Sequence, residues 1–182
     1  MKRGVTAGVP EWAVPTPERD HVQGPMDAPN MLLEYGDYEC PYCGAAYPVV
    51  KAVQQRLGAR LCFAFRNFPL VNSHPHAQHA AEAAEAAGAE GRFWEMHDLL
   101  YENQGALEDE DLAEYASMLG LNAERLMKDV RGGTYTARVR QDVRSGARQG
   151  VNGTPCFFIN GVRYDGTPGV EDLLAALTAE PG

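Results

Sequence analysis

Long apolar runs are missing from this chain, and so is an apolar segment behind its basic start. No stretch approaches the roughly 20 apolar residues that a membrane-spanning helix needs. Lys2 and Arg3 are not followed by the apolar region of a signal peptide. We therefore expect no membrane association and a cytoplasmic location.

Positive charge and cysteine are also in short supply. The 16 Lys and Arg residues stand against 25 Asp and Glu, and the resulting net charge of −9 disfavours nucleic-acid binding. Four cysteines in 182 residues without a signal peptide do not make a disulfide scaffold. The apolar share of 45% is ordinary for a globular protein with a sizeable core. We therefore expect one soluble globular domain.

Two of the four cysteines form a Cys-x-x-Cys motif, Cys40-Pro41-Tyr42-Cys43. The motif follows an apolar stretch, Met31 to Tyr35, and opens a segment with helical periodicity. A cysteine pair at a strand-to-helix junction is typical of a thiol–disulfide redox site. Unpaired N–H groups at a helix N-terminus favour negative charge and so favour the thiolate. We expect Cys40 to be the exposed attacking thiolate and Cys43 the buried resolving thiol.

A zinc half-site is the alternative interpretation of the same motif. A second Cys-x-x-Cys or a His-x-x-x-His pair at suitable spacing is absent from the sequence. His74, His76 and His79 are the only histidine cluster, and we expect them to start a helix and pack rather than bind metal. No metal and no cofactor are therefore predicted.

Apolar periodicity divides the chain into two α/β parts separated by helices. Residues 31–36 and 60–66 read as strands around a helix that ends near Leu57. After Gly150 a strand, an Asn160-Gly161 hairpin turn, a second strand and a closing helix follow. The predicted division is an extended arm (1–20), a first α/β half with the cysteine pair (21–73), an all-helical insert (74–149) and a second α/β half (150–182).

Two segments in this order resemble a known family. They are Tyr35 to Gly44, which contains the cysteine pair, and Gly150 to Gly161, which contains Thr154-Pro155. Together they are similar to the DsbA-like branch of the thioredoxin superfamily, over roughly residues 20–178. The resemblance implies an α/β thioredoxin fold, βαβ … ββα, with the all-helical insert between the two halves.

The resemblance also implies roles for individual residues. Thr154-Pro155 matches the family's cis-proline loop, which docks the substrate chain, and Pro41 and Tyr42 are expected to contribute to substrate binding. Glu34 lies six residues before Cys40, the offset of the family's buried acid, and is expected to relay a proton to the buried thiol. An exposed strand glutamate is the alternative for Glu34.

The sequence departs from the family at two positions. Tyr42 stands where the periplasmic oxidants typically carry His, and a neutral side chain gives the thiolate less electrostatic help. We therefore expect a less oxidising pair than in those enzymes. Cys156 follows the predicted cis-proline and is interpreted as a small buried residue, with a third redox thiol as the alternative. Cys62, in a strand-like run, is likewise expected to be buried.

These patterns predict a protein disulfide oxidoreductase that uses a Cys40/Cys43 dithiol, in the reductase or isomerase direction. Its expected partners are protein thiols and disulfides, with a thioredoxin reductase-like protein or glutathione as the electron donor. A glutathione-linked reductase of glutaredoxin type is the first alternative, because Pro41-Tyr42 is the glutaredoxin dipeptide. A non-catalytic binding module with a thioredoxin fold is the second.

Overall fold

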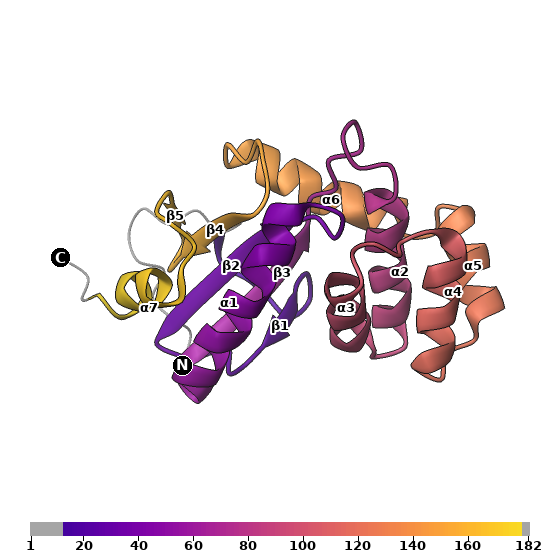
Figure 1. Cartoon of the computed structure of the whole chain (residues 1–182). Coiled ribbons are helices and arrows are strands. Elements are labelled where there is room, and N and C mark those ends of the chain that lie inside the picture. The colour runs from indigo at the N-terminus through magenta and orange to yellow at the C-terminus, as the bar shows by residue number, and fades with distance from the viewer. Residues whose placement is uncertain (1–12, 180–182) are drawn as a thin grey trace. The chain divides into compact units, whose positions relative to one another are not determined.

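The computed structural model describes residues 13–179 and contains one five-stranded sheet with the order β1-β3-β2-β4-β5 (Figure 1). The strands are β1 (His21–Gln23), β2 (Asn30–Gly36), β3 (Leu61–Asn67), β4 (Cys156–Ile159) and β5 (Val162–Tyr164). The indigo β2 pairs antiparallel with β4, although these strands come from distant parts of the sequence. This arrangement brings the two predicted α/β halves into one sheet.

Helices α1 and α7 belong to these α/β halves, and the helices between β3 and β4 form the insert. Their bounds are α1 (Pro41–Leu57), followed by the short 3-10 turn η2 (Gly58–Arg60), then α2 (Ala77–Ala89), α3 (Phe93–Glu102), α4 (Asp109–Met118), α5 (Ala123–Arg131), α6 (Thr136–Arg148) and α7 (Val170–Thr178). The order β2-α1-β3, helices, β4-β5-α7 confirms the predicted thioredoxin fold with a helical insert.

The chain forms two compact units, and each is described by itself. The sheet unit contains residues 1–35, 45–66 and 155–182, and the helical unit contains residues 36–44 and 67–154. The cysteine pair and Thr154 belong to the helical unit, whereas Glu34 and Pro155 belong to the sheet unit. The division at 1–20, 21–73, 74–149 and 150–182 stays a prediction.

The sheet unit is built on fully buried strands. All residues of β3 and β4 are buried, as expected from their apolar runs. Asn160 (φ 50°) and Gly161 (φ 84°) both adopt positive φ, so the predicted type I′ hairpin turn between β4 and β5 is confirmed. The Asn160 side chain also accepts a hydrogen bond from the Met31 N–H at 2.9 Å.

The N-terminal segment packs more closely than its proline content suggests. Residues 1–12 of the predicted arm lie outside the described residues. Ala13 is fully buried and Asp20 is nearly so. Directly after Asp20, β1 pairs antiparallel with β3, a strand too short for its period to be recognised in the sequence.

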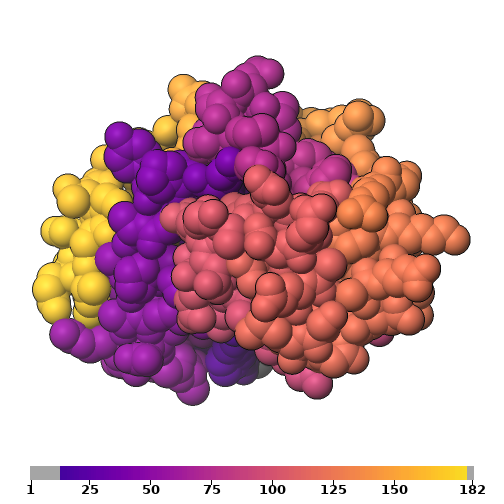
Figure 2. All heavy atoms as spheres, turned by 45° about the vertical axis from the view of Figure 1, so that its right-hand side comes forward, coloured from indigo at the N-terminus to yellow at the C-terminus, as the bar shows by residue number. Residues whose placement is uncertain are grey.

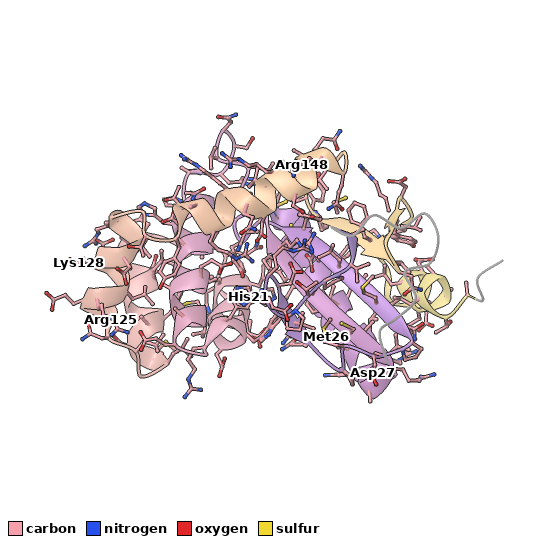
Figure 3. All side chains as sticks on the ribbon, turned by 180° about the vertical axis from the view of Figure 1, so that it is seen from behind. His21, Met26, Asp27, Arg125, Lys128 and Arg148 are labelled. Atoms are coloured by element: carbon pink, nitrogen blue, oxygen red, sulfur yellow. The ribbon has the colours of Figure 1, made fainter. Side chains whose placement is uncertain are left out.

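The helical unit is organised around α2, whose alanines allow close approach of α3, α4, α5 and α6. Asn122 caps α5 by accepting a hydrogen bond from the Arg125 N–H, and Glu108 and Asp111 form a capping box on α4. Arg125 and Lys128 point outward from α5 (Figure 3). The atoms of α3 and α4 form a continuous salmon-coloured surface in the space-filling view (Figure 2).

Candidate active site

The cysteine pair occupies the first turn of α1. Cys40 immediately precedes Pro41, the first helical residue, and its carbonyl accepts the Gly44 N–H at 3.0 Å. All four cysteines of the chain are thiols in this structure. Cys43 is fully buried, as expected, but Cys40 is only 3% exposed, so the predicted exposure of its side chain is wrong. The segment at Thr154 accounts for the difference, since its carbonyl lies 3.5 Å from the Cys40 Sγ.

The surroundings of Cys40 stabilise its ionised form. Hydrogen bonding with the Cys43 side chain is the largest cause of a Cys40 pKa that is lowered to about 5. Burial opposes this effect by disfavouring charge, while the side chain of Thr154 lowers the pKa further. The backbone N–H groups of Tyr42 and Cys43, in the first turn of α1, add to the lowering. Cys40 therefore has the electrostatics of a nucleophilic cysteine at neutral pH.

Asp37 connects the loop before α1 to both cysteines. Its N–H points to the Cys43 Sγ at 3.5 Å, and its carbonyl accepts the Cys40 N–H at 3.2 Å. Its fully buried carboxylate accepts the Glu39 N–H at 2.8 Å and the Leu70 N–H at 2.8 Å. The same carboxylate forms an ion pair with His74, at 2.7 Å from Nδ1. One side chain thus joins the cysteine loop to the loop before α2.

Gln104, in the loop after α3, holds the same turn from another direction. Its Nε2 donates to the carbonyls of Tyr38 at 2.8 Å and Cys40 at 2.9 Å. Its Oε1 occupies the space that a Cβ at position 44 would need, since the two would lie 1.9 Å apart. The glycine after the second cysteine therefore makes room for this amide. Tyr38 is also held through its hydroxyl, 3.0 Å from the Nδ1 of His97.

The other predicted binding residues have different surroundings. Pro41 is exposed, and Tyr42 is 75% exposed, so its ring is available to a partner. Pro155 is half-buried and lies directly before β4 in the sheet unit. The cis isomer of Pro155 and the substrate-binding roles stay predictions.

Glu34 and Cys156 lie on opposite faces of the sheet. In the β2–β4 register Glu34 stands opposite Phe157, and Tyr35 stands opposite Cys156. Directly opposed residues share a face and neighbours alternate, so the Cys156 side chain lies on the face away from Glu34. Glu34 is 2% exposed, which excludes the exposed-glutamate alternative.

The two cysteines outside the motif are both buried, as expected from their strand positions. Burial raises the pKa of the Cys156 thiol above its ordinary value, the opposite of the effect at Cys40. Cys62 lies in β3 with its sulfur 3.9 Å from that of Met26. Both therefore have the environment of small buried side chains.

Sequence reasoning missed Asp37, His74 and Gln104, and it treated the histidines as packing residues. Each of the three histidines instead pairs with a carboxylate: His74 with Asp37, His76 with Glu39 and His79 with Asp109. Among residues 13–179, no group of three or more His, Cys, Asp or Glu is placed to hold a metal ion. Asp37 carried a usable signal, because an Asp in the loop just before a helix commonly accepts the N–H two positions on, as Asp37 does from Glu39.

The fold and the cysteine site define a thiol–disulfide oxidoreductase architecture, and comparisons with known proteins agree. The chain belongs to the thioredoxin family, since a family model described as Thioredoxin matches residues 16–179. A thioredoxin-like oxidoreductase from Silicibacter pomeroyi DSS-3 is 26% identical with a TM-score of 0.77, over 87% of this chain and 90% of that chain.

Two further solved structures share the fold. BdbD from Bacillus subtilis has a TM-score of 0.81 at 22% identity, and the match covers 90% of this chain and 93% of that chain. MdbA from Corynebacterium diphtheriae, a thiol-disulfide oxidoreductase, has a TM-score of 0.70 at 20% identity, over 89% and 91% of the two chains. These matches confirm the fold that the DsbA-like resemblance implies.

Curated relatives at higher identity carry a different name. The chain is 45% identical over 177 residues to the Na(+)/H(+) antiporter NhaA 1 of Salinispora arenicola, which covers 97% of this chain and 27% of the relative. It is 42% identical to NhaA 1 of Mycobacterium sp. strain KMS, over 90% of this chain and 27% of the relative. The chain therefore spans about a quarter of the length of these relatives. No helix within residues 13–179 is both long and apolar enough to cross a membrane.

Proposed function

We propose that the chain catalyses thiol–disulfide exchange on protein substrates through the Cys40/Cys43 pair. The Cys40 thiolate attacks a substrate disulfide, forming a Cys40–substrate bond and releasing one substrate thiolate. Cys43 loses its proton and attacks the Cys40 sulfur, which closes the Cys40–Cys43 disulfide and releases the second substrate thiolate. Two electrons pass from the pair to the substrate, and the reverse sequence oxidises a substrate dithiol.

The observation that carries this proposal is the Cys40 pKa of about 5 at the start of α1. At neutral pH nearly all of this thiol is ionised, and the thiolate is the form that attacks disulfides. The buried Cys43 needs a proton acceptor before it can attack in turn. We assign this role to Glu34, whose burial gives it the environment of a proton relay.

The direction we propose is reduction or isomerisation, with isomerisation favoured by the Cys40 pKa. A stabilised thiolate stabilises the reduced pair and so makes the couple more oxidising. The value of about 5 lies between about 7 in thioredoxin and about 3.5 in DsbA. We therefore expect a reduction potential between about −270 and −120 mV, the range that contains protein disulfide isomerase at about −180 mV.

Equilibration of the full chain with glutathione buffers, read by mass spectrometry of trapped thiols, measures this potential. Isomerase activity on a scrambled disulfide protein and reductase activity on insulin follow from the same preparation. Cys40→Ser is expected to abolish both activities, and Cys43→Ser to accumulate mixed disulfides with substrate. An active Cys40→Ser variant would refute the proposal.

The glutaredoxin-type alternative is tested by the same variant set. Glutathione can resolve a mixed disulfide when the second cysteine is absent, so this alternative predicts glutathione-dependent turnover by Cys43→Ser. The non-catalytic alternative predicts that Cys40 resists alkylation at pH 6, where a thiol with a pKa near 5 reacts readily. Glutathione and a thioredoxin reductase-like protein are both proposed as electron donors.

We also propose a cytoplasmic location.

The name of the antiporter relatives describes proteins about four times the length of this match, and we do not transfer ion transport to this chain. The 45% identity to the Salinispora arenicola relative, across almost the whole chain, supports a related thioredoxin-type segment within that protein.

A further inference from the structure

We propose that the Asp37–His74 ion pair is a positioning device that holds both cysteines and sets the reactivity of the Cys40 thiolate. Its His74 imidazolium supplies a positive charge that interacts with Cys40, whereas the side chain of Tyr42 is neutral. This inference rests on the proposed thiol–disulfide exchange and assigns part of its control to a residue outside the Cys-x-x-Cys motif.

The backbone of Asp37 contacts both cysteines. Its N–H reaches the Cys43 Sγ at 3.5 Å and its carbonyl accepts the Cys40 N–H at 3.2 Å. Any movement of Asp37 therefore moves the hydrogen-bond partners of both residues. The contacts that hold Asp37 in place therefore also fix the geometry of the Cys40/Cys43 pair.

His74 and the turn before it fix the Asp37 carboxylate. The Leu70 N–H at 2.8 Å and the His74 Nδ1 at 2.7 Å both reach the same oxygen, Oδ2. The Leu70 carbonyl in turn accepts the His74 N–H at 2.9 Å, which closes a ring of hydrogen bonds. A fully buried carboxylate is thus held by a turn that presents one N–H and one imidazole to it.

The charge of His74 matters to Cys40 as well as to Asp37. Burial lowers the pKa of His74, but hydrogen bonding and the charge of Asp37 raise it more, and the charges of Cys40 and Glu39 add to the rise. The groups facing this imidazole are therefore Asp37, Cys40 and Glu39, with His76 paired to the last of these. Interaction energies are mutual, so an imidazolium that Cys40 stabilises also stabilises the Cys40 thiolate.

Loss of the imidazolium leaves the buried Asp37 charge uncompensated beside the cysteines. A carboxylate near a developing thiolate disfavours the thiolate, because like charges raise the pKa of an acid. The expected consequence is a less ionised Cys40 and a more reducing couple.

Glu39 and His76 provide a matched control pair in the same loops. The His76 Nδ1 lies 2.9 Å from Glu39 Oε1, and the His76 N–H donates to Glu39 Oε2 at 2.7 Å. The chemistry is the same, but these side chains are 43% and 19% exposed, against 19% and 0% for His74 and Asp37. Solvent therefore screens the control pair more strongly.

The test compares His74→Asn with His76→Asn in the full chain. Each change keeps a side-chain N–H and removes the charge. The first readout is the pH profile of Cys40 alkylation by iodoacetamide, followed by mass spectrometry. We expect His74→Asn to slow alkylation roughly threefold at pH 5.5 and to leave the rate at pH 8 unchanged, as a higher Cys40 pKa requires. His76→Asn should change both rates less than twofold.

The second readout is the equilibrium of the cysteine pair with glutathione. His74→Asn is expected to shift it toward the disulfide by roughly tenfold, because the reduced form loses thiolate stabilisation. His74→Lys keeps a positive charge at this position. Its equilibrium with glutathione should therefore lie closer to that of the parent chain than the equilibrium of His74→Asn does. The double variant Asp37→Asn/His74→Asn removes both charges and should recover much of the parent alkylation profile.

Thermal unfolding of each variant separates a folding defect from an effect on reactivity. Equal changes in His74→Asn and His76→Asn, or an unchanged profile in a folded His74→Asn variant, would overturn the inference. Neither readout uses substrate turnover. A parent chain with a reactive Cys40 but no exchange activity would therefore defeat the proposed function alone, and an active parent with an unmoved His74→Asn profile would defeat only this inference.

Discussion

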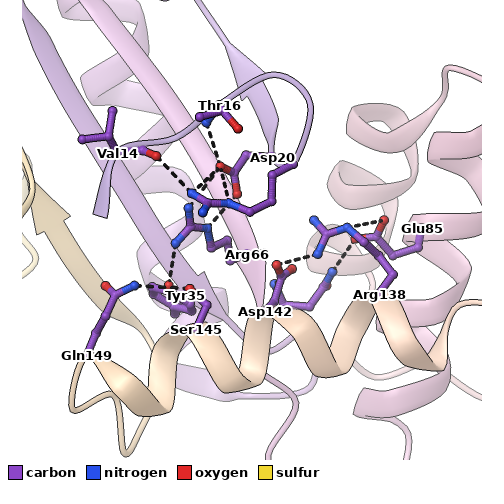
Figure 4. Close-up of polar contacts among 12 residues, drawn as sticks. Val14, Thr16, Asp20, Tyr35, Arg66, Glu85, Arg138, Asp142, Ser145 and Gln149 are labelled. Carbon is purple, nitrogen blue, oxygen red and sulfur yellow. Dashed lines mark hydrogen bonds and ion pairs between the residues drawn. The ribbon is translucent and has the colours of Figure 1, made fainter. Parts of the chain in front are cut away.

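The sheet unit and the helical unit each bury an arginine–carboxylate cluster, and the two clusters differ in their balance of charge (Figure 4). In the sheet unit two guanidiniums meet one carboxylate. Arg66 is fully buried and bonds Asp20 through Nε at 2.7 Å and Nη2 at 3.0 Å, and the more exposed Arg19 reaches the same carboxylate at 3.1 Å. The Arg66 Nη1 donates to the Tyr35 hydroxyl at 2.7 Å. Although burial raises the pKa of Asp20, the hydrogen bond and charge of Arg66 hold it below its usual value.

In the helical unit two carboxylates share one guanidinium. Arg138 bonds Asp142 at 2.5 Å and lies 3.8 Å from Glu85. Asn67 supplies neutral donors, from its N–H to Asp142 at 3.0 Å and from its amide to Glu85 at 2.7 Å. Burial is the main reason that the pKa of Asp142 rises to about 6, and the Glu85 charge adds to it. Both carboxyls are buried, so the number of cations that compensate each carboxyl decides whether its pKa falls or rises.

The largest expected effect follows from breaking the Arg66–Asp20 ion pair. Arg66→Met leaves the buried Asp20 charge without its main partner and should lower the free energy of unfolding by about 3–5 kcal/mol. Urea unfolding at pH 7 measures the change. Arg19→Ala is the matched control, because Arg19 also reaches Asp20, at 3.1 Å, from a more exposed position. Its expected cost is about 1 kcal/mol or less, and equal losses in the two variants would contradict the comparison.

In the helical unit, the contribution of Asp142 to the free energy of unfolding should depend on pH with the opposite sign to that of Asp20. The Asp142 pKa is about 6 in the folded chain and about 3.8 when unfolded, so the folded state holds the proton more tightly between these values. Stability from this group is therefore present at low pH and is lost as pH rises toward 6, by an amount on the order of 2–3 kcal/mol. Asp142→Asn should remove this loss.

Urea unfolding of parent and Asp142→Asn at several pH values between 4 and 7 measures the difference curve. The gain from Asp142→Asn should grow as pH rises and level off above 6. Asp20, whose folded pKa is lowered, contributes stability above about 3.8 that is lost as pH falls further, so Asp20→Asn should show the reverse trend when the series is extended below pH 4. A difference curve for Asp142→Asn that is flat across this range would disprove its raised pKa.

Local sequence patterns predicted most elements of both units, with β1 as an exception, but not their charged contacts. The spacing of apolar residues and the Asn160-Gly161 turn are local signals, which involve residues only a few positions apart in the sequence. They were therefore sufficient to predict the fold and the position of the cysteine pair. The partners of Asp37, at Leu70 and His74, are more than 30 positions away, and no periodicity reports such contacts. The same limit hid the pairing of Arg66 with Asp20.

The neutral contact between Gln104 and the turn at Gly44, in the helical unit, is expected to contribute less to the free energy of unfolding than either charged cluster. Gly44→Ala forces the Gln104 amide away from the carbonyls of Tyr38 and Cys40, which should cost about 1–3 kcal/mol. The measurement is again urea unfolding, with Cys40 alkylation as the functional readout. In a Gln104→Ala background the space is empty, and Gly44→Ala should instead stabilise α1 by about 0.5–1 kcal/mol. Additive effects of the two changes would exclude the steric coupling.

The smallest expected effect concerns Cys156, which tests whether the sheet unit takes part in the redox chemistry. Its thiol is buried and its pKa is raised, whereas Cys40 in the helical unit is ionised at neutral pH. Cys156→Ala should therefore lower the free energy of unfolding by about 1 kcal/mol or less and leave the glutathione equilibrium of the Cys40/Cys43 pair unchanged.

Native-state alkylation at pH 7 should label Cys40 much faster than Cys156, because the raised pKa of Cys156 keeps it in the less reactive thiol form; burial does not separate the two, since they are 3% and 7% exposed. Cys62, which is similarly buried, provides the internal control within the same spectrum. Labelling of Cys156 at the rate of Cys40, or a Cys40–Cys156 disulfide in the oxidised chain, would establish a third redox thiol. The proposed difference between the two units would then be wrong, because a buried thiol of the sheet unit would take part in the same disulfide exchange as the cysteines of the helical unit.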